Sequence, residues 1–207
     1  MKRCVIVGGA QIKRYDISKS YLREDDYMIY CDCGLKHRDG LGRDADLIIG
    51  DFDSYDNPHS DTETIVLPTV KDDTDTVYAM KEALSRGFDD FLFLGVFGGR
   101  FDQTLSNLSM LLKLFKLGKT ALAVDDRGET EIFGSKKVYI EDKYRFFSVI
   151  AYASDIKGVN IRNARYPLEN ADVTVDWSFG VSNEVLPGKT AEVWADEGTP
   201  VLIKIFR

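Results

Sequence analysis

Short apolar runs alternate with longer amphipathic stretches over the first 126 residues of the chain. The apolar runs end in Gly, Asp or Pro and span residues 3–9, 27–34, 45–51, 64–68, 90–99 and 120–126. Short runs that are apolar at nearly every position are typical of parallel strands with both faces buried. The pattern predicts an α/β domain with a doubly wound (Rossmann-like), mainly parallel sheet.

Two of the stretches between these runs have the period of an amphipathic helix. The apolar stripe within residues 73–87 consists of Val77, Met80, Ala83 and Leu84. The corresponding stripe within residues 102–118 consists of Leu105, Leu108, Leu111, Leu112 and Phe115. Each stretch ends in glycine, which is suited to terminate a helix. We expect both stripes to face inward.

The pattern changes after about residue 126 to short segments of alternating polarity. Strand-like segments continue through residues 129–155, 171–178, 191–198 and 200–207. Turn signals such as Lys157-Gly158 and Pro187-Gly188 lie between them, and no segment keeps a helical stripe for long. This pattern predicts an all-β sandwich or barrel. We therefore expect two domains, residues 1–126 and 127–207.

Composition excludes several classes of protein. A hydrophobic fraction of 44% fits a packed globular chain, and a net charge of -7 without a Lys/Arg run argues against nucleic acid as a partner. No apolar run has the length of a signal peptide or a membrane span, which predicts a cytoplasmic protein without a membrane partner. The cysteines, Cys4, Cys31 and Cys33, lack the spacing of a disulfide framework.

Acidic residues and glycines follow four of the predicted strands. They are Asp32, Asp51 and Asp53, the group Asp72, Asp73 and Asp75, and the run Gly98, Gly99, Arg100 and Asp102. Each has a purely structural alternative: a turn, a helix N-cap at Asp73 or Thr74, or an acid that favours the helix dipole. In an open α/β sheet, however, the carboxyl ends of the strands form the ligand-binding edge.

Together these residues indicate more than turns and caps. Several carboxylates at one edge raise one another's pKa, and a hard cation such as Mg²⁺ removes that conflict. Gly98, Gly99 and Arg100 place backbone N–H groups and a guanidinium before a helix, an arrangement that favours phosphate. The combination predicts a site for Mg²⁺ and a nucleoside triphosphate. It is not a P-loop, because the sequence contains no Walker A motif.

Several blocks of the chain resemble the signature blocks of thiamin pyrophosphokinase. They are GDFDS (50–54), KDDTDTVYAMKEAL (71–84) and GVFGGRFDQTLSNL (95–108), with residues 31–54 similar to the D-G-G block and residues 157–185 to the thiamin-binding segment. The resemblance covers nearly the whole chain. It implies an α/β domain followed by a β-sandwich-like domain, assembled as a homodimer. The implied reaction transfers a pyrophosphoryl group from ATP to the hydroxyl of thiamin, giving thiamin diphosphate and AMP.

The resemblance also implies roles for individual residues. Mg²⁺ on ATP would be held by Asp51, Asp53 and Asp75, and the catalytic set would add Arg100 and Asp102. The implied ATP and phosphate contacts are Asp32, Gly34, Ser54, Asp72, Thr74, Gly98, Gly99 and Arg100. The implied thiamin contacts are Gln103, Asn107, Tyr166, Ser182 and Asn183, with Ser182 and Asn183 reaching the partner subunit's site.

Two positions depart from the family pattern. Cys33 stands where many members have Gly, and Gln103 where many bacterial members have His, so we assign no general-base role to Gln103. Asp51 and Asp102 are both candidates to accept the hydroxyl proton. Trp177 is interpreted either as a stacking residue or as a buried strand aromatic. The alternative functions are a pyrophosphokinase acting on a pterin-like alcohol, a D-x-D nucleotide-sugar transferase, and a nucleotide or thiamin sensor.

Overall fold

The computed structural model describes residues 3–52, 61–70, 72–177 and 179–207. The chain divides into two compact units, Met1–Asp126 and Arg127–Arg207, each considered by itself below. Within the described residues, no helix combines the length and the hydropathy needed to cross a membrane.

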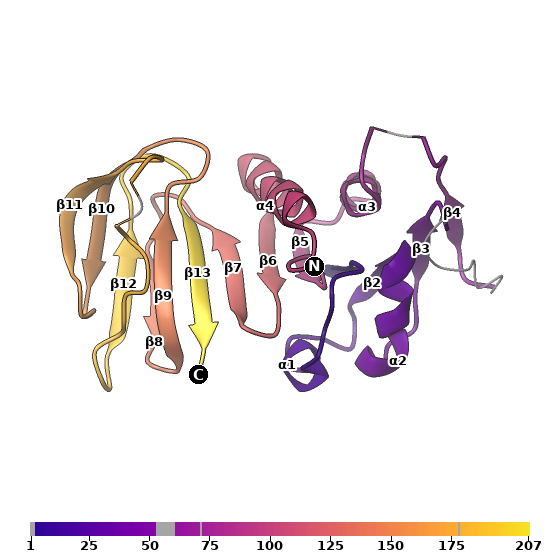
Figure 1. The fold of residues 1–207 in the computed structure, drawn as a ribbon, viewed down its shortest axis with the longest axis horizontal. Helices are drawn as coiled ribbons and strands as arrows, with labels where there is room; N and C mark the ends of the chain where they lie inside the picture. Colours follow the sequence, from indigo (N-terminus) through magenta and orange to yellow (C-terminus); the bar gives the residue numbers. More distant parts are fainter. Residues whose placement is uncertain (1–2, 53–60, 71, 178) are drawn as a thin grey trace. The chain divides into compact units, whose positions relative to one another are not determined.

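A parallel sheet forms the centre of the first unit (Figure 1). Its strands are β1 (Arg3–Val7), β2 (Tyr27–Cys31), β3 (Leu47–Gly50), β4 (Thr64–Val66), β5 (Asp90–Leu94) and β6 (Thr120–Val124). Their order in space is β4-β3-β2-β1-β5-β6, with every described pairing parallel. The chain moves outward from β1 to β4 and then resumes with β5 on the other side of β1. The switch point where ligands bind to such sheets therefore lies between β1 and β5.

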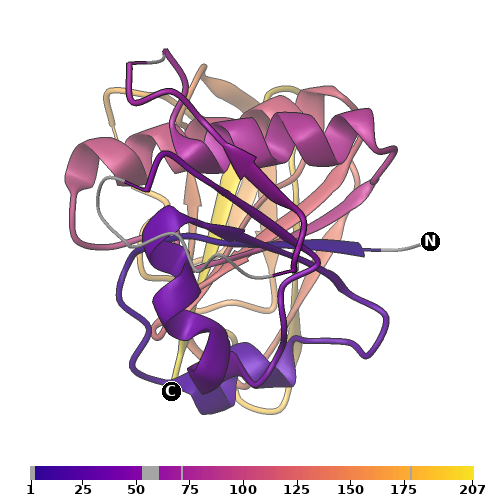
Figure 2. The same ribbon diagram turned by 90° about the vertical axis from the view of Figure 1, so that its right-hand side faces the viewer.

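Helices cover both faces of this sheet, as Figures 1 and 2 show. On one face lie α3 (Asp75–Ser85) and α4 (Phe101–Lys116), and on the other lie α1 (Tyr15–Ser20) and α2 (Arg38–Leu41). A short 3₁₀ helix, η1 (Asp32–His37), directly follows β2. Because both faces are covered, β1 and β5 are buried along almost their whole length, as the continuous apolar runs predict. The doubly wound prediction is confirmed.

The predicted inward face of α4 is wrong in part. The buried residues of this helix are Asn107, Met110, Leu111 and Leu114, whereas Leu105 is 40% exposed. Leucines occur on several sides of α4, so their spacing alone does not single out one face. A polar residue, Asn107, lies on the buried face because its amide forms hydrogen bonds there.

Two antiparallel sheets form the second unit. The strands β7 (Gly128–Ile132), β13 (Val201–Phe206) and β9 (Tyr144–Ile150) pair in that order. The other sheet pairs β11 (Leu168–Val173), β10 (Ile156–Arg162), β12 (Thr190–Trp194) and β8 (Val138–Glu141). Apolar side chains from both sheets meet in one core that includes Phe147, Val149, Leu202, Ile140, Ile161 and Val193. The predicted β-sandwich is confirmed.

One turn predicted in this unit, at Lys157 and Gly158, is wrong. Lys157 and Gly158 belong to β10, where Gly158 has a φ of 63° and the register with β11 shifts. The glycine therefore marks a β-bulge instead of a turn. Pro187 and Gly188 do form a turn, as predicted.

Candidate active site

A pocket of about 630 Å³ opens at the carboxyl ends of the strands in the first unit. It lies at the switch point, where the loops after β1, β2, β3 and β5 meet the N-termini of α3 and α4. Its lining includes residues 8–11, Asp32, Cys33, Lys36, Asp51, Thr74, Asp75, Thr76, Gly95, Val96, Gly98, Gly99, Arg100, Gln103 and Asn107.

Three carboxylates in this pocket lie close together. Asp32, Asp51 and Asp75 each offer an oxygen, and these oxygens all lie within 4.8 Å of one another. Asp32 is buried, and its Oδ1 has no hydrogen-bond partner among the described residues. Burial raises the pKa of Asp32, and the negative charges of Asp75 and Asp51 raise it further. Clustered hard oxygen donors of this kind fit a divalent cation such as Mg²⁺.

Local backbone geometry brings Asp32 and Asp51 together. A Cβ on Gly50 would lie 3.0 Å from the Cβ of Asp32, so glycine permits the close approach of these strand ends. Asp32 has a φ of 38° and Phe52, directly after Asp51, has a φ of 56°. Positive φ is uncommon for non-glycine residues and is held only where the surrounding structure fixes it. The surrounding buried sheet therefore holds the backbone at both strand ends in this positive-φ conformation.

A buried hydrogen-bond network fixes the start of α3, where Asp75 lies. Thr74 is the N-cap, and its Oγ1 accepts a hydrogen bond from the Val77 N–H at 3.3 Å. Thr76 Oγ1 donates to Asn107 Oδ1 at 2.9 Å, and Asn107 Nδ2 donates to the Val96 carbonyl at 2.6 Å. The network joins α3, α4 and the loop after β5 around the pocket floor.

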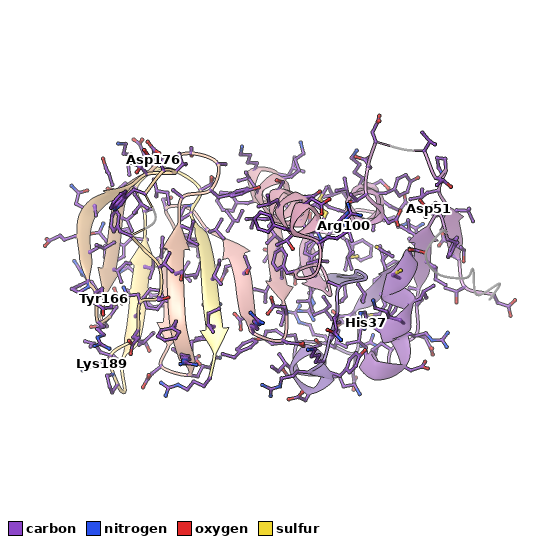
Figure 3. All side chains as sticks on the ribbon, viewed as in Figure 1. His37, Asp51, Arg100, Tyr166, Asp176 and Lys189 are labelled. Atoms are coloured by element: carbon purple, nitrogen blue, oxygen red, sulfur yellow. The ribbon has the colours of Figure 1, made fainter. Side chains whose placement is uncertain are left out.

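The N-terminus of α4 forms the opposite, cationic part of the pocket. Gly98 and Gly99 have φ values of 96° and 72°, a conformation that favours glycine. Arg100 precedes the helix and donates to both carboxylate oxygens of Asp102, at 3.1 and 2.5 Å. This exposed pairing lowers the pKa of Asp102. Figure 3 shows Arg100 at the start of α4 and Asp51 at the end of β3. A long helix with exposed N–H groups and a guanidinium at its start favours an anion.

Two family models match this chain. Residues 18–123 match the thiamin pyrophosphokinase catalytic domain, and residues 136–199 match the thiamin pyrophosphokinase vitamin B1 binding domain. The chain belongs to the thiamin pyrophosphokinase family.

Individual relatives agree with this family assignment. Thiamine pyrophosphokinase of Bacillus subtilis is 28% identical over 145 residues, which cover 66% of this chain and 68% of the relative. A crystal structure of thiamine pyrophosphokinase from Bacillus subtilis has a TM-score of 0.86 at 23% identity and covers 100% of this chain and 99% of its own. A crystal structure of thiamin pyrophosphokinase from Geobacillus thermodenitrificans has a TM-score of 0.83 at 21% identity, and the match covers 100% of this chain and 98% of that chain. At these identities the structural likeness establishes the fold.

The pocket of this thiamin pyrophosphokinase family member gathers many of the residues predicted from the sequence. These are Asp32, Asp51, Thr74, Asp75, Gly98, Gly99, Arg100, Gln103 and Asn107. Asp53 and Ser54 lie outside the described residues. Asp72 is exposed, and neither it nor Asp102 lines the pocket. Gly34 does not line it either: a Cβ there would lie 2.2 Å from the Val7 carbonyl oxygen, so this glycine lets η1 pack against β1.

The remaining predicted residues lie in the second unit. Asn183 is buried, donating from Nδ2 to the Tyr166 carbonyl at 2.7 Å and accepting from the Tyr166 N–H at 3.0 Å. Ser182 has a φ of 59°, and its N–H donates to Ser148 Oγ at 3.0 Å. The Tyr166 ring is exposed. Asn183 therefore holds together the two segments that present Tyr166 and Ser182.

The interpretation of Trp177 as a buried strand aromatic is wrong. Trp177 is 70% exposed and follows β11 outside any strand. Figure 3 shows Asp176 near the top of the second unit and Tyr166 lower in the same view.

Sequence reasoning missed the loop after β1 and the cation next to it. Residues 8–11 and Lys36 line the pocket. A Cβ on Gly8 would lie 2.7 Å from the Gly95 carbonyl oxygen, and one on Gly95 would lie 2.6 Å from the Gly8 carbonyl oxygen. The sequence does contain a signal for this loop, the Gly8-Gly9 pair at the end of the first strand. The pair can be assigned to the pocket only when the strand order is known, because that order places the end of β1 at the switch point.

Proposed function

We propose that this protein transfers a pyrophosphoryl group from ATP to the hydroxyl of thiamin, giving thiamin diphosphate and AMP. The supporting observation is one pocket that combines three clustered carboxylates with the glycines and arginine before α4. Membership of the thiamin pyrophosphokinase family favours thiamin as the acceptor over a pterin-like alcohol or a nucleotide sugar.

The metal site we propose consists of Asp32, Asp51 and Asp75. The sequence-based set named Asp53 in place of Asp32, and Asp53 lies outside the described residues. Support comes from the spacing of the oxygens and from the Asp32 Oδ1 atom, which finds no donor within the described structure. When bound, Mg²⁺ would offset the charge of the phosphate oxygens.

The residues of the chain would act mainly by position and charge. The thiamin oxygen forms a bond to the β-phosphorus of ATP while the bond to the α,β-bridging oxygen breaks, and AMP leaves with that oxygen. Arg100 and the first N–H groups of α4 would stabilise the developing negative charge. Of the two candidate acceptors of the hydroxyl proton, Asp51 lines the pocket, whereas Asp102 is paired with Arg100 outside it. We therefore assign that role to Asp51, through the carboxylate oxygen that would not hold Mg²⁺.

The reaction is tested by product analysis with ATP, Mg²⁺ and thiamin, omitting each in turn. We expect AMP and thiamin diphosphate in equal amounts only when all three are present. ADP with thiamin monophosphate would contradict the proposal by showing single phosphoryl transfer. Bound ATP without any thiamin-dependent product would favour another acceptor alcohol or a sensor.

We also propose a homodimer in which Tyr166 and Ser182, held in place by the buried Asn183, bind thiamin in the partner subunit's site, together with Gln103. The exposure of Tyr166 and its connection to Asn183 support this part. Inactive Asp51→Asn and Tyr166→Ala chains, mixed in equal amounts after subunit exchange, should recover about a quarter of wild-type activity. That fraction follows because half of the dimers are mixed and each mixed dimer has one intact site. Absence of recovery, with exchange verified by tagged subunits, would place each site within one chain.

A further inference from the structure

Two cations line the described pocket, and they differ in their partners. Arg100 is paired with Asp102, whereas Lys36 makes no ion pair within the described part of the chain. Lys36 is exposed and lies on η1, and its Nζ donates to the Gly9 carbonyl at 2.5 Å. An ammonium group has three N–H donors, so the bond to Gly9 leaves two for another acceptor.

The position of this ammonium group is fixed by its neighbours. His37, the next residue, is buried, and its Nε2 contacts the Ala10 carbonyl at 2.8 Å while its Nδ1 contacts the Tyr15 hydroxyl at 2.8 Å. Lys36 and His37 thus bind the carbonyls of two successive residues, Gly9 and Ala10. These contacts attach η1 to the loop after β1 and hold the Lys36 amine at the pocket wall.

The charge of the pocket indicates what this amine would bind. Three carboxylates outnumber the two cations in the described lining, so a polyphosphate would bind there together with a divalent cation held by the carboxylates, and the two cationic side chains would contact its remaining oxygens. Lys36 belongs to the same short helix as Asp32, one of the residues in the carboxylate cluster. An ammonium group held next to this carboxylate cluster is suited to contact a phosphate as a point charge.

We propose that Lys36 binds the polyphosphate of the nucleotide beyond its α-phosphate. The inference rests on the proposed function, because it takes ATP as the ligand of this pocket. Lys36 would orient the phosphates from the η1 wall while Arg100 does so from the N-terminus of α4. Its role is to position the donor, and the thiamin site does not depend on it.

The test compares Lys36→Met with Lys36→Arg and with Lys116→Met, a control on the exposed side of α4. Calorimetry in the presence of Mg²⁺ measures the Kd of ATP, of inorganic tripolyphosphate and of adenosine for each protein. We expect Lys36→Met to weaken ATP and tripolyphosphate about 10- to 100-fold, the range of a lost charged hydrogen bond, and to leave adenosine unchanged. Lys36→Arg should recover part of the loss, and Lys116→Met should resemble the wild type.

Two results would overturn this inference. Unchanged ATP binding by Lys36→Met would show that the amine does not contact the phosphates. An equal loss of adenosine and ATP affinity would show that Lys36 acts only by holding the loop through Gly9. The proposed function is tested separately by the turnover of thiamin in the wild type. A protein that binds ATP without turning over thiamin would refute that function. The ratio of the Kd of Lys36→Met to that of the wild type, for ATP and for adenosine, would still decide the role of Lys36.

Discussion

Replacing Asn107 by alanine should destabilise the first unit by removing the centre of its buried polar network. Asn107 is 4% exposed, and its amide bonds both Thr76 Oγ1 and the Val96 carbonyl. In the variant, Thr76 Oγ1 keeps a hydrogen-bond partner, because it also lies 3.1 Å from Thr74 Oγ1. The Val96 carbonyl loses the hydrogen bond from the Asn107 amide, so its loss is the larger of the two. Two lost hydrogen bonds, with one carbonyl left in a buried site, correspond to about 2–4 kcal/mol of unfolding free energy.

The two units can be followed separately in one urea titration. All the described helices lie in the first unit, so circular dichroism at 222 nm reports on that unit. Both tryptophans, Trp177 and Trp194, lie in the second unit, so their fluorescence reports on the other. With an m-value of about 2 kcal/mol/M, Asn107→Ala should lower the midpoint of the helix signal by about 1–2 M urea.

A double-mutant cycle identifies the cause. Thr76→Val combined with Asn107→Ala should destabilise by about 1 kcal/mol less than the sum of the single variants, because both remove the same hydrogen bond. Ser109→Ala, an exposed change on the same helix, serves as the control and should stay within about 0.5 kcal/mol of the wild type. The reasoning fails if Asn107→Ala also stays within that range, or if the cycle shows simple additivity.

Three further changes test the site and its support. Asp51→Asn should lower turnover at least about 100-fold while the urea midpoints hold, and near-normal turnover would refute its assignment. Burial lowers the pKa of His37 below its usual 6.5, so the unfolded chain takes up the proton first and stability falls as pH drops below about 6.5. His37→Gln should remove up to about 1.4 kcal/mol per pH unit of that dependence, measured by urea unfolding from pH 7.5 to 5.5. Gly34→Ala would bring a Cβ to 2.2 Å from a backbone oxygen and should lower the free energy of unfolding by about 3 kcal/mol or more, measured by the same helix signal.

The convergence of Asp32, Asp51 and Asp75 could be predicted from the sequence because parallel strands impose it. Each acid follows an apolar run, or opens the helix after one, and strands that run the same way place those ends at one edge of the sheet. The prediction required only the type of sheet, which continuous apolar runs indicate. Element order and site location were therefore accessible without any side-chain geometry.

Side-chain networks and close backbone approaches could not be predicted in this way. In the sequence, Asn107 is only a polar residue within a leucine-rich helix. Its buried position depends on the Val96 carbonyl and the Thr76 hydroxyl, which belong to other elements. The position of the Lys36 amine at the pocket wall depends on the Gly9 carbonyl, 27 residues earlier in the chain. Hydrophobic period contains no information about such contacts, because they join elements that are distant in sequence.

The structural and functional interpretations of the acidic motifs are therefore not alternatives. Thr74 caps α3, as the structural interpretation predicts, and the same capped turn positions Asp75 beside the other two carboxylates. Asp32 opens a 3₁₀ helix immediately after β2, and that turn brings its carboxylate toward Asp51. Since capping and turn formation fix the backbone of each acid independently, a cluster of like charges can persist in the folded chain. Capping and turn formation thus fix each acid locally, and the parallel sheet brings the three acids together.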